Sequence, residues 1–277
     1  MINSTYLNIP NMCRGHEFYV DIYSESPIEL GTKEYPYKSA KAIFIELLNY
    51  HSNQDKSVSI YLKENQNHYF EDGTNFFLNI TSVRLTTYSD DDTAMHRAKV
   101  IPTRIAQSPE NYKTAFTLLK NTTLMRDEVI AAGGFTDAEN FALNDGTITL
   151  LTLRSNTYID NIDVERDSGD LGVSTIFLYV AYLQEKELQL TNVDINVTGI
   201  IANGIDPFKG LFENMTIDGY GVERGMEFYT TCNYPEASLT SEMVYNNIKL
   251  VMSSDRTIPF SPSMIEYQGP GNMTIQN

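Results

Sequence analysis

The chain has 277 residues and a formal net charge of −16 at pH 7, with 36 acidic against 20 basic side chains. This negative charge argues against nucleic acid and anionic membranes as partners, because both would be repelled at long range. The hydrophobic content of 42% is spread without a long apolar run, which excludes a transmembrane helix and predicts no membrane insertion. The first residues lack the basic and apolar regions of a signal peptide.

A strand is the first predicted element, at residues 17–23, where apolar and polar side chains alternate. After a turn-rich link, residues 38–50 form an amphipathic helix that Ser39 would cap. One face of this helix carries Ala40, Ile43, Phe44, Leu47 and Leu48. We expect this helix to cover the N-terminal end of the structure that follows. We treat 1–277 as one domain, made of an N-terminal strand and link (1–37), a capping helix (38–50) and coils (57–277).

Several strands are predicted next, at 57–62, within 75–88 with a bend at Ser82, within 96–105 and at 147–153. The part between 107 and 157 is the least regular. Ser82 and Asn161 are 79 residues apart, which leaves room for about three coils or for two coils and an excursion. From residue 158 to the end, a repeat runs with little interruption, and 173–183 and 225–231 have the composition of full strands.

The repeat has the form apolar, any, Asn, apolar, any, apolar. Its asparagines are 31, 22, 33 and 25 residues apart, a spacing typical of solenoid coils: Asn161, Asn192, Asn214, Asn247 and Asn272. An early copy has Ser82 in place of Asn, and the last copy has Pro270 at the first apolar position. Because Asn tolerates the left-handed conformation, we predict a two-residue bend that contains each Asn, and a ladder of stacked asparagines. The pattern predicts a parallel β-helix.

Three segments resemble pectin-lyase-fold domains of large predicted surface proteins of ciliates. These segments are 31–62, with its Tyr-Pro-Tyr-Lys and Asn-Tyr-His-Ser, the Thr-Cys-Asn-Tyr-Pro-Glu-Ala run at 231–237, and the terminal Gly-Asn-Met-Thr-Ile. The resemblance implies a single-stranded, right-handed parallel β-helix of exported origin. It implies no characterised activity.

Candidate metal ligands are the outward-facing carboxylates of the repeat. Asp163 and Asp194 occupy the same position in successive copies, so stacking would bring them about 4.8 Å apart. Together with Asp218 and Glu165 they are candidates for Ca²⁺, the alternative being solvated surface acids. A second candidate is an acid–base cluster of lyase type, in which the acidic loop 90–92 lies beside Arg97, Lys99 and Arg104. The alternative for this loop is a charged, solvated surface.

The histidines share no metal-ligand spacing, and we predict surface or capping roles for all four: His16, His51, His68 and His96. The 18 tyrosines suit either strands or a sugar-stacking surface, although Trp, which sugar-binding surfaces usually include, is absent from the chain.

Six N-glycosylation sequons suit an extracellular or cell-surface protein, at Asn3, Asn79, Asn121, Asn196, Asn214 and Asn272. Cys13 and Cys232 either form one disulfide or stay free. Sequons without a signal peptide, and a chain that ends in a strand, lead us to expect a fragment or processed piece of a longer exported chain.

Three functions follow as hypotheses. The first is a non-catalytic extracellular structural or surface glycoprotein, whose partners are other copies of itself or other extracellular proteins and which could assemble head to tail into filaments. The second is a polysaccharide lyase or hydrolase acting on acidic polysaccharide. The third is a carbohydrate-binding adhesin. The hydrolase motifs of this fold, Gly-His-Gly and Arg-Ile-Lys, are absent from the sequence, so no residue is predicted to be catalytic.

Overall fold

The fold is built from parallel strands. The computed structural model of the chain describes residues 17–40, 42–43, 57–71, 82–91, 96–103, 148–152, 156–165, 175–179, 187–196, 199–204, 209–219, 227–231, 241–252, 265–268 and 271–276. These residues form two parallel sheets with almost no helix, so the prediction of an all-β fold of stacked parallel strands is confirmed for the described part of the chain.

Sheet A contains ten strands. Eight of them follow one another as rungs: β1 (Glu17–Val20), β2 (Ser57–Lys63), β4 (Ser82–Tyr88), β7 (Asn156–Glu165), β9 (Glu187–Asn196), β11 (Lys209–Gly219), β13 (Ser241–Met252) and β15 (Gly271–Gln276). The other two, β3 (Asn67–Glu71) and β5 (Ala98–Thr103), pair with each other, and β5 also pairs with β7.

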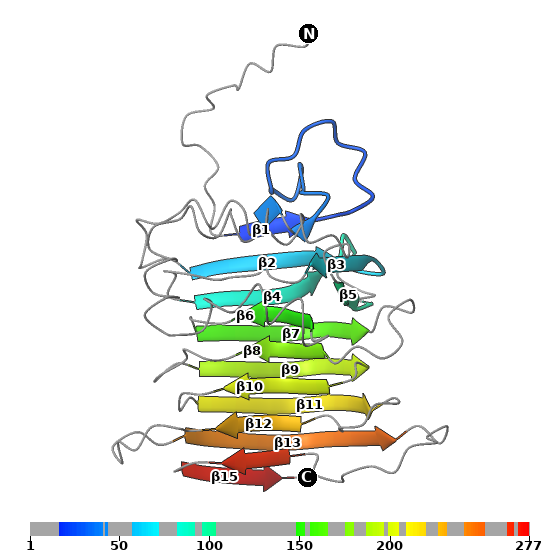
Figure 1. Cartoon of the computed structure of the whole chain (residues 1–277). Coiled ribbons are helices and arrows are strands. Elements are labelled where there is room, and N and C mark those ends of the chain that lie inside the picture. Colours follow the sequence, from blue (N-terminus) through cyan, green and yellow to red (C-terminus); the bar gives the residue numbers. More distant parts are fainter. Residues whose placement is uncertain are drawn as a thin grey trace, which may run out of the picture.

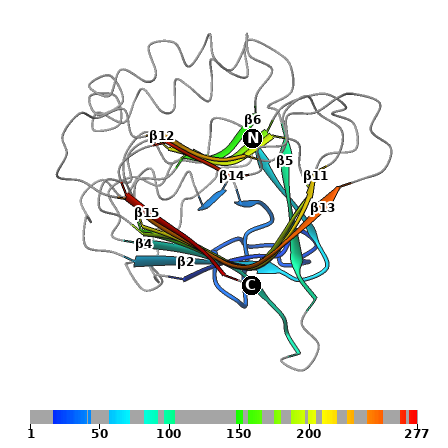
Figure 2. The same cartoon turned by 90° about the horizontal axis from the view of Figure 1, so that it is seen from below.

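Sheet B contains five strands, β6 (Ile148–Thr152), β8 (Thr175–Tyr179), β10 (Gly199–Gly204), β12 (Glu227–Thr231) and β14 (Ile265–Gln268). From β6 to β15 the chain alternates between the sheets, one strand of B and then one of A. Figure 1 shows the strands of sheet A stacked as rungs, with the labelled strands of sheet B running the opposite way. Seen along the stack in Figure 2, they superpose into two layers, consistent with a β-helix.

The core consists of side chains stacked in register between the coils. One inward row crosses all eight rungs of sheet A: Phe18, Ile60, Leu85, Ile159, Leu190, Phe212, Tyr245 and Ile275. Its inner members are 2% exposed or less, whereas Ile275, on the last rung, is 58% exposed. Period-two alternation predicts these rows, because every second side chain of a strand faces the same side.

Gly210 belongs to a neighbouring inward row, between Leu188 and Met243. A Cβ built on Gly210 would lie 2.6 Å from the Met243 sulfur and 2.8 Å from the Phe212 ring. Gly at this position therefore makes room for two large core side chains, Phe212 on the same strand and Met243 on the next one.

The predicted bend lies at a single Asn in four coils. Asn161, Asn192, Asn214 and Asn247 have φ between 52° and 58°, the left-handed conformation that the repeat predicts. They occupy equivalent positions, since the residues on either side pair in register, and Asn247 Nδ2 donates to Asn214 Oδ1 at 2.8 Å. We call them the corner asparagines. Each divides its strand into a first and a second arm.

Two of the corner positions predicted from the sequence, Ser82 and Asn272, are wrong. Ser82 begins β4 and pairs with Ser57 and Asn156, five residues before the corner of β7. Asn272 pairs with Glu242, five residues before the corner Asn247. The start of a strand also carries a polar residue followed by alternating apolar ones, so the repeat pattern matches it equally well. The residue aligned with Asn247 is Asn277, which lies outside the described residues.

The first coils turn differently. Between β2 and β3 the left-handed residue is Asn65, with φ 56°, in a longer turn. In the next coil residues 89–97 separate β4 from β5. β4 and β5 pair directly with the first and second arms of β7, so these strands are one coil step apart in sheet A. Both alternatives predicted for the interval from Ser82 to Asn161, three coils or two coils and an excursion, are therefore wrong.

The outer edge of β1 is covered by its own chain. Tyr19 N donates to Gly31 O at 2.8 Å, Tyr37 N donates to Tyr19 O at 2.9 Å, and Asp21 N donates to Tyr37 O at 2.9 Å. Gly31 has φ 73°, and a Cβ there would lie 2.4 Å from the Tyr37 ring. Most of the predicted helix 38–50 lies outside the described residues, but 40 and 42–43 are helical, and Ala40 and Ile43 belong to the core.

Candidate functional site

The candidate site is a row of charged side chains on the outer face of sheet A, just after the corners. Lys99, Asp163, Asp194 and Thr216 pair in that order across β5, β7, β9 and β11. Buried residues flank each carboxylate along its strand, as Ile162 and Val164 do for Asp163. Alternation therefore turns the charged groups outward.

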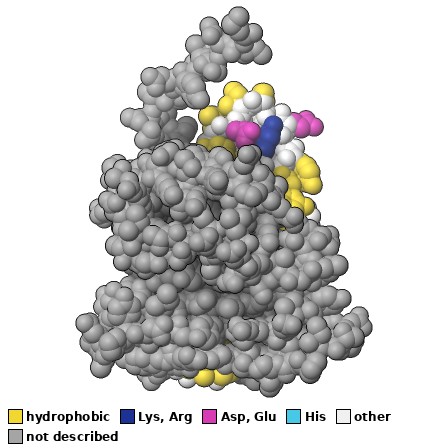
Figure 3. All heavy atoms as spheres, viewed as in Figure 1, with side chains coloured by type: hydrophobic (Ala, Val, Ile, Leu, Met, Phe, Trp, Pro, Cys, Tyr) yellow, Lys and Arg dark blue, Asp and Glu magenta, His cyan; other side chains and the backbone are white. Residues whose placement is uncertain are grey.

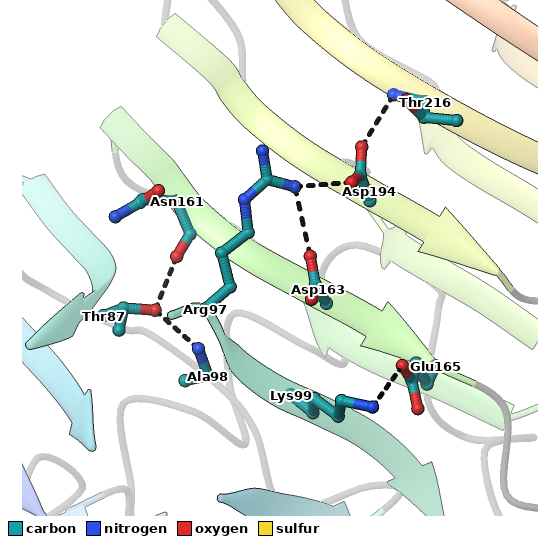
Figure 4. Close-up of polar contacts among 9 residues, drawn as sticks. All are labelled: Thr87, Arg97, Ala98, Lys99, Asn161, Asp163, Glu165, Asp194 and Thr216. Atoms are coloured by element: carbon teal, nitrogen blue, oxygen red, sulfur yellow. Dashed lines mark hydrogen bonds and ion pairs between the residues drawn. The ribbon is translucent and has the colours of Figure 1, made fainter. Parts of the chain in front are cut away.

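Arg97 bridges the two carboxylates. Its Nη1 lies 3.1 Å from Asp163 Oδ1 and 2.7 Å from Asp194 Oδ2 (Figure 4). The other oxygen of Asp194 accepts a hydrogen bond from Thr216 N at 3.1 Å. The guanidinium of Arg97, which precedes β5, thus contacts the next coil through Asp163 on β7 and the coil after that through Asp194 on β9. We call Arg97, Asp163 and Asp194 the arginine clasp.

A second ion pair joins β5 to β7. Lys99 Nζ lies 2.7 Å from Glu165 Oε1, and this hydrogen bond raises the pKa of the Lys99 ammonium. The loop that carries Arg97 is held by Thr87, whose Oγ1 accepts from Ala98 N at 2.9 Å and donates to the carbonyl of Asn161 (Figure 4). The buried Thr87 hydroxyl therefore joins the end of β4, the start of β5 and the corner of β7.

The environment of Asp163 raises the pKa of its carboxyl. Burial is the main cause, and the charges of Asp194 and Glu165 add to it, whereas the Arg97 guanidinium acts in the opposite direction. Only 27% of the Asp163 side chain is exposed. In the clasp, partial burial therefore favours the protonated form of the Asp163 carboxyl, whereas the Arg97 guanidinium favours the ionised form of the same carboxyl.

The carboxylates predicted to bind calcium are only partly brought together. Asp163 and Asp194 lie on adjacent rungs, but Arg97 already supplies their positive charge. Asp218 lies two residues beyond Thr216, the residue that pairs with Asp194, and so it belongs to another row. Among the described residues no group of three or more His, Cys, Asp or Glu side chains is placed to hold a metal ion.

Three members of the predicted acid–base cluster around residues 90–92 form ion pairs with residues outside that cluster. Asp90 forms an ion pair with Lys63, whereas Arg97 and Lys99 pair with carboxylates of β7 and β9. Asp92 and Arg104 lie outside the described residues.

A further ion pair lies on the first arm of the sheet. Arg84 donates to Asp160 through Nε at 2.8 Å and Nη2 at 3.0 Å, and Thr86 Oγ1 donates to the same carboxylate at 2.9 Å. The hydrogen bond to Asp160 raises the pKa of Arg84. This bidentate contact, like the arginine clasp, joins neighbouring coils.

The prediction of a surface or capping role is wrong for His68. This side chain is 1% exposed, on β3, and its Nε2 lies 2.9 Å from Lys63 O. His68 follows the run Glu-Asn-Gln-Asn, which looks like a turn, but it is the second residue of the next strand and faces inward. His96 is exposed, and His16 and His51 lie outside the described residues.

Tyrosines gather at the N-terminal end of sheet A. Tyr19 and Tyr61 stack with ring centroids 4.8 Å apart, and Tyr88 meets Tyr19 edge-on at 5.1 Å. Stacking covers one face of the first two rings, which leaves less aromatic surface for a sugar. Larger exposure occurs at Tyr23 and Tyr69, and Figure 3 shows apolar side chains exposed near acidic ones at this end of the molecule.

Three of the predicted glycosylation sites lie in described strands. Asn196 is exposed at the end of β9, Asn214 is an exposed corner whose side chain accepts from Asn247, and Asn272 lies in β15. The other three, together with both cysteines, lie outside the described residues: Asn3, Asn79, Asn121, Cys13 and Cys232.

Comparison with protein-family models, with curated proteins and with solved structures finds no match to this chain. In the part of the chain that is described, no helix is long and apolar enough to cross a membrane.

Replacing Arg97 with Gln is expected to raise the pKa of Asp163 further, because Arg97 is the described group that lowers this pKa through charge and hydrogen bonding. The clasp is partly solvated, so we expect a loss of at most about 1 kcal/mol of unfolding free energy at neutral pH. A carboxyl with a raised folded-state pKa contributes stability that is present below its unfolded value and lost as pH rises through the folded value. The variant should therefore recover toward wild-type stability in acid.

Carboxyl carbon NMR and urea unfolding at several pH values would measure both effects. Arg84→Gln is the matched control, since it breaks a bidentate pair in the same sheet but leaves the clasp intact. An unchanged Asp163 titration in the Arg97 variant would show that the clasp is not formed.

Proposed function

We propose that this chain is a non-catalytic structural β-helix of an extracellular or cell-surface protein. The supporting observation is that charged side chains on the outer face of sheet A pair with one another across coils. Arg84 pairs with Asp160, Arg97 with Asp163 and Asp194, and Lys99 with Glu165. Such ion pairs connect neighbouring coils of the stack, and we expect connected coils in a stiff, rod-shaped structural protein.

The proposal includes three features predicted from the sequence. A right-handed winding of the coils rests on the family resemblance, a helix over the N-terminal end rests on the apolar periodicity of 38–50, and N-linked glycans at the exposed sequons rest on the sequon motif. Of the two sequon asparagines whose side chains are described, Asn196 is the better-placed acceptor, because it is exposed and ends its strand, whereas Asn214 is engaged with a neighbouring corner.

Association with other copies is also part of the proposal. Met273 and Ile275 are 43% and 58% exposed on β15, in line with the buried Met243 and Tyr245 of the previous rung. Head-to-tail addition at the opposite end of sheet A would have to displace the segment that covers β1. We therefore place self-association at the β15 end.

Electron microscopy of material isolated from its natural source tests this proposal. The expected result is a rod-shaped particle with glycan density at Asn196 and with protein density continuing beyond β15. Isolated particles with bare sequons, and solvent against Met273 and Ile275, would contradict it.

A second candidate function is a polysaccharide lyase or hydrolase acting on acidic polysaccharide. The observation that favours it is the raised pKa of Asp163 beside a second carboxylate and a cation, since perturbed acids gather at active sites. The test is incubation with pectate and alginate, with and without Ca²⁺, followed by ultraviolet absorbance and reducing ends. Product that disappears in Asp163→Asn but persists in Asp160→Asn would replace the structural proposal.

A further inference from the structure

His68 stands at the head of an apolar row in the core. Register places the following residues in line with it along the second arm: Val100, Val164, Ile195, Ile217 and Leu250. His68 is thus a titratable side chain, only 1% exposed, at a position that the following coils fill with aliphatic residues.

The hydrogen bonding of His68 defines its protonation. Nε2 lies 2.9 Å from the carbonyl of Lys63, and a carbonyl only accepts, so Nε2 carries the proton. Nδ1 is buried and has no hydrogen-bond partner among the described residues. A second proton, on Nδ1, would create a buried donor and a buried charge without an acceptor, and both are costly.

The neighbouring turn joins β3 to the N-terminal segment. Gln66, two residues before His68, is buried, and its Oε1 accepts from Ile22 N at 2.9 Å while its Nε2 donates to Asp21 Oδ1 at 2.7 Å. The carbonyl of Gln66 accepts from Lys99 N at 2.9 Å. Gln66 therefore connects the residues after β1 to β5, next to the buried imidazole.

Among the described charged groups, Asp21 is the one whose charge favours protonated His68. On the β2–β3 turn, Lys63 contributes its carbonyl while its ammonium pairs with Asp90, and Glu64 bonds to Ser89 and to His96 N. From β5, Val100 lies opposite His68, and the ammonium of Lys99 pairs with Glu165.

Asp21 is already engaged, because its Oδ1 accepts from Gln66 Nε2 and from Tyr23 N. Movement of this carboxylate toward an imidazolium at residue 68 would compete with its hydrogen bonds to Gln66 and Tyr23, and lifting of the segment to admit water would break them. Either response weakens the link between Gln66 and the N-terminal segment.

We propose that His68 is a pH-sensitive latch: its neutral imidazole keeps residues 17–40 closed over the first coils, and its protonation releases them. Release is local, because this segment lies at the end of the stack, where opening disturbs a single layer of contacts. The proposal is independent of the function proposed above.

The direction of the pH effect follows from burial. Burial lowers the pKa of His68 below its ordinary 6.5, and the Lys63 carbonyl and the Asp21 charge oppose this shift. A histidine with a lowered folded-state pKa contributes stability that is complete above its unfolded value and is lost as pH falls below it. The closed state therefore belongs to neutral pH and the released state to acidic pH.

Hydrogen exchange between about pH 7.5 and about pH 5, corrected for intrinsic rates, tests the latch. In the wild type we expect protection of the Asp21 and Ile22 amides to fall by up to about tenfold per pH unit as pH drops below the ordinary histidine pKa of 6.5, and to level off below the lowered pKa of His68 in the closed state. Protection in β9 and β11 should stay constant. In His68→Gln, which keeps a donor for the Lys63 carbonyl and cannot ionise, the fall should disappear, whereas the exposed-histidine control His96→Gln should retain it.

An NMR titration of the His68 ring in the wild type provides a second readout that needs no variant. Its midpoint should lie below 6.5. The loss of protection should begin at a higher pH than this midpoint and level off below it. A midpoint at or above 6.5, an equal loss of protection in His68→Gln, or a loss spread evenly over all coils would overturn the proposal. If the variant does not fold, the wild-type titration and exchange profile decide the question.

Discussion

Replacing Phe212 with Ala is expected to lower the free energy of unfolding by about 3–5 kcal/mol, the cost of emptying a large aromatic site in a packed core. Phe212 is 1% exposed and stacks on Tyr245 with centroids 5.0 Å apart and planes 10° from parallel. A substantial share of the total stability of a typical domain would be lost. Urea unfolding followed by circular dichroism measures the change.

Two controls separate packing from general damage in this experiment. Phe212→Leu keeps most of the volume, and it should cost less than about 2 kcal/mol. Tyr69→Ala removes a ring that is 51% exposed and should stay within about 0.5 kcal/mol of the wild type. Similar losses for Phe212→Ala and Tyr69→Ala would mean that the inward row is not the core.

Replacing a corner asparagine with a β-branched residue has the second largest expected effect. Asn192 has φ 54°, and Val in the left-handed conformation is strained, so Asn192→Val should cost about 1–3 kcal/mol. Asn192→Gly accepts the same conformation without strain and should stay within about 0.5 kcal/mol of the wild type. Thermal or urea unfolding of the two variants side by side measures the difference.

The corner prediction has a control within the chain. Asn272 carries the same repeat pattern but lies in β15, five residues before the corner position. Asn272→Val should therefore be tolerated, because Val suits a strand. If the variants at Asn192 and Asn272 lost equal stability, the corner assignment would be wrong.

The stacking of the coils could be predicted from the sequence because local chemistry specifies it. Four corners carry an Asn in the one conformation that few other residues accept, and apolar side chains alternate on both sides of each. Register at the ends of the repeat could not be predicted in the same way. The pattern around Ser82 and Asn272 is also that of a strand start, and only pairing with neighbouring strands distinguishes the two.

The candidate site could be predicted only in part. The adjacency of Asp163 and Asp194 follows from the repeat, since both occupy the same position in successive coils. The contact of Arg97 does not, because this residue lies outside the repeat and reaches the carboxylates from a loop. His68 and Asn65 were missed because a polar run conceals the point where the turn ends and β3 begins.

The uneven spacing of the corner asparagines indicates where this chain tolerates insertions and deletions. Consecutive corner asparagines are 31, 22 and 33 residues apart, yet the strands on both sides keep perfect register. Apart from a register shift between Ile200 and Ala202 in sheet B, the variation lies between the described strands, whereas one left-handed Asn forms each of these four corners. An insertion in a connecting segment leaves every rung aligned, but one extra residue after Asn214 would turn Met215 and Ile217 to the solvent. Insertions and deletions should therefore accumulate in the connections and be purged next to the corners.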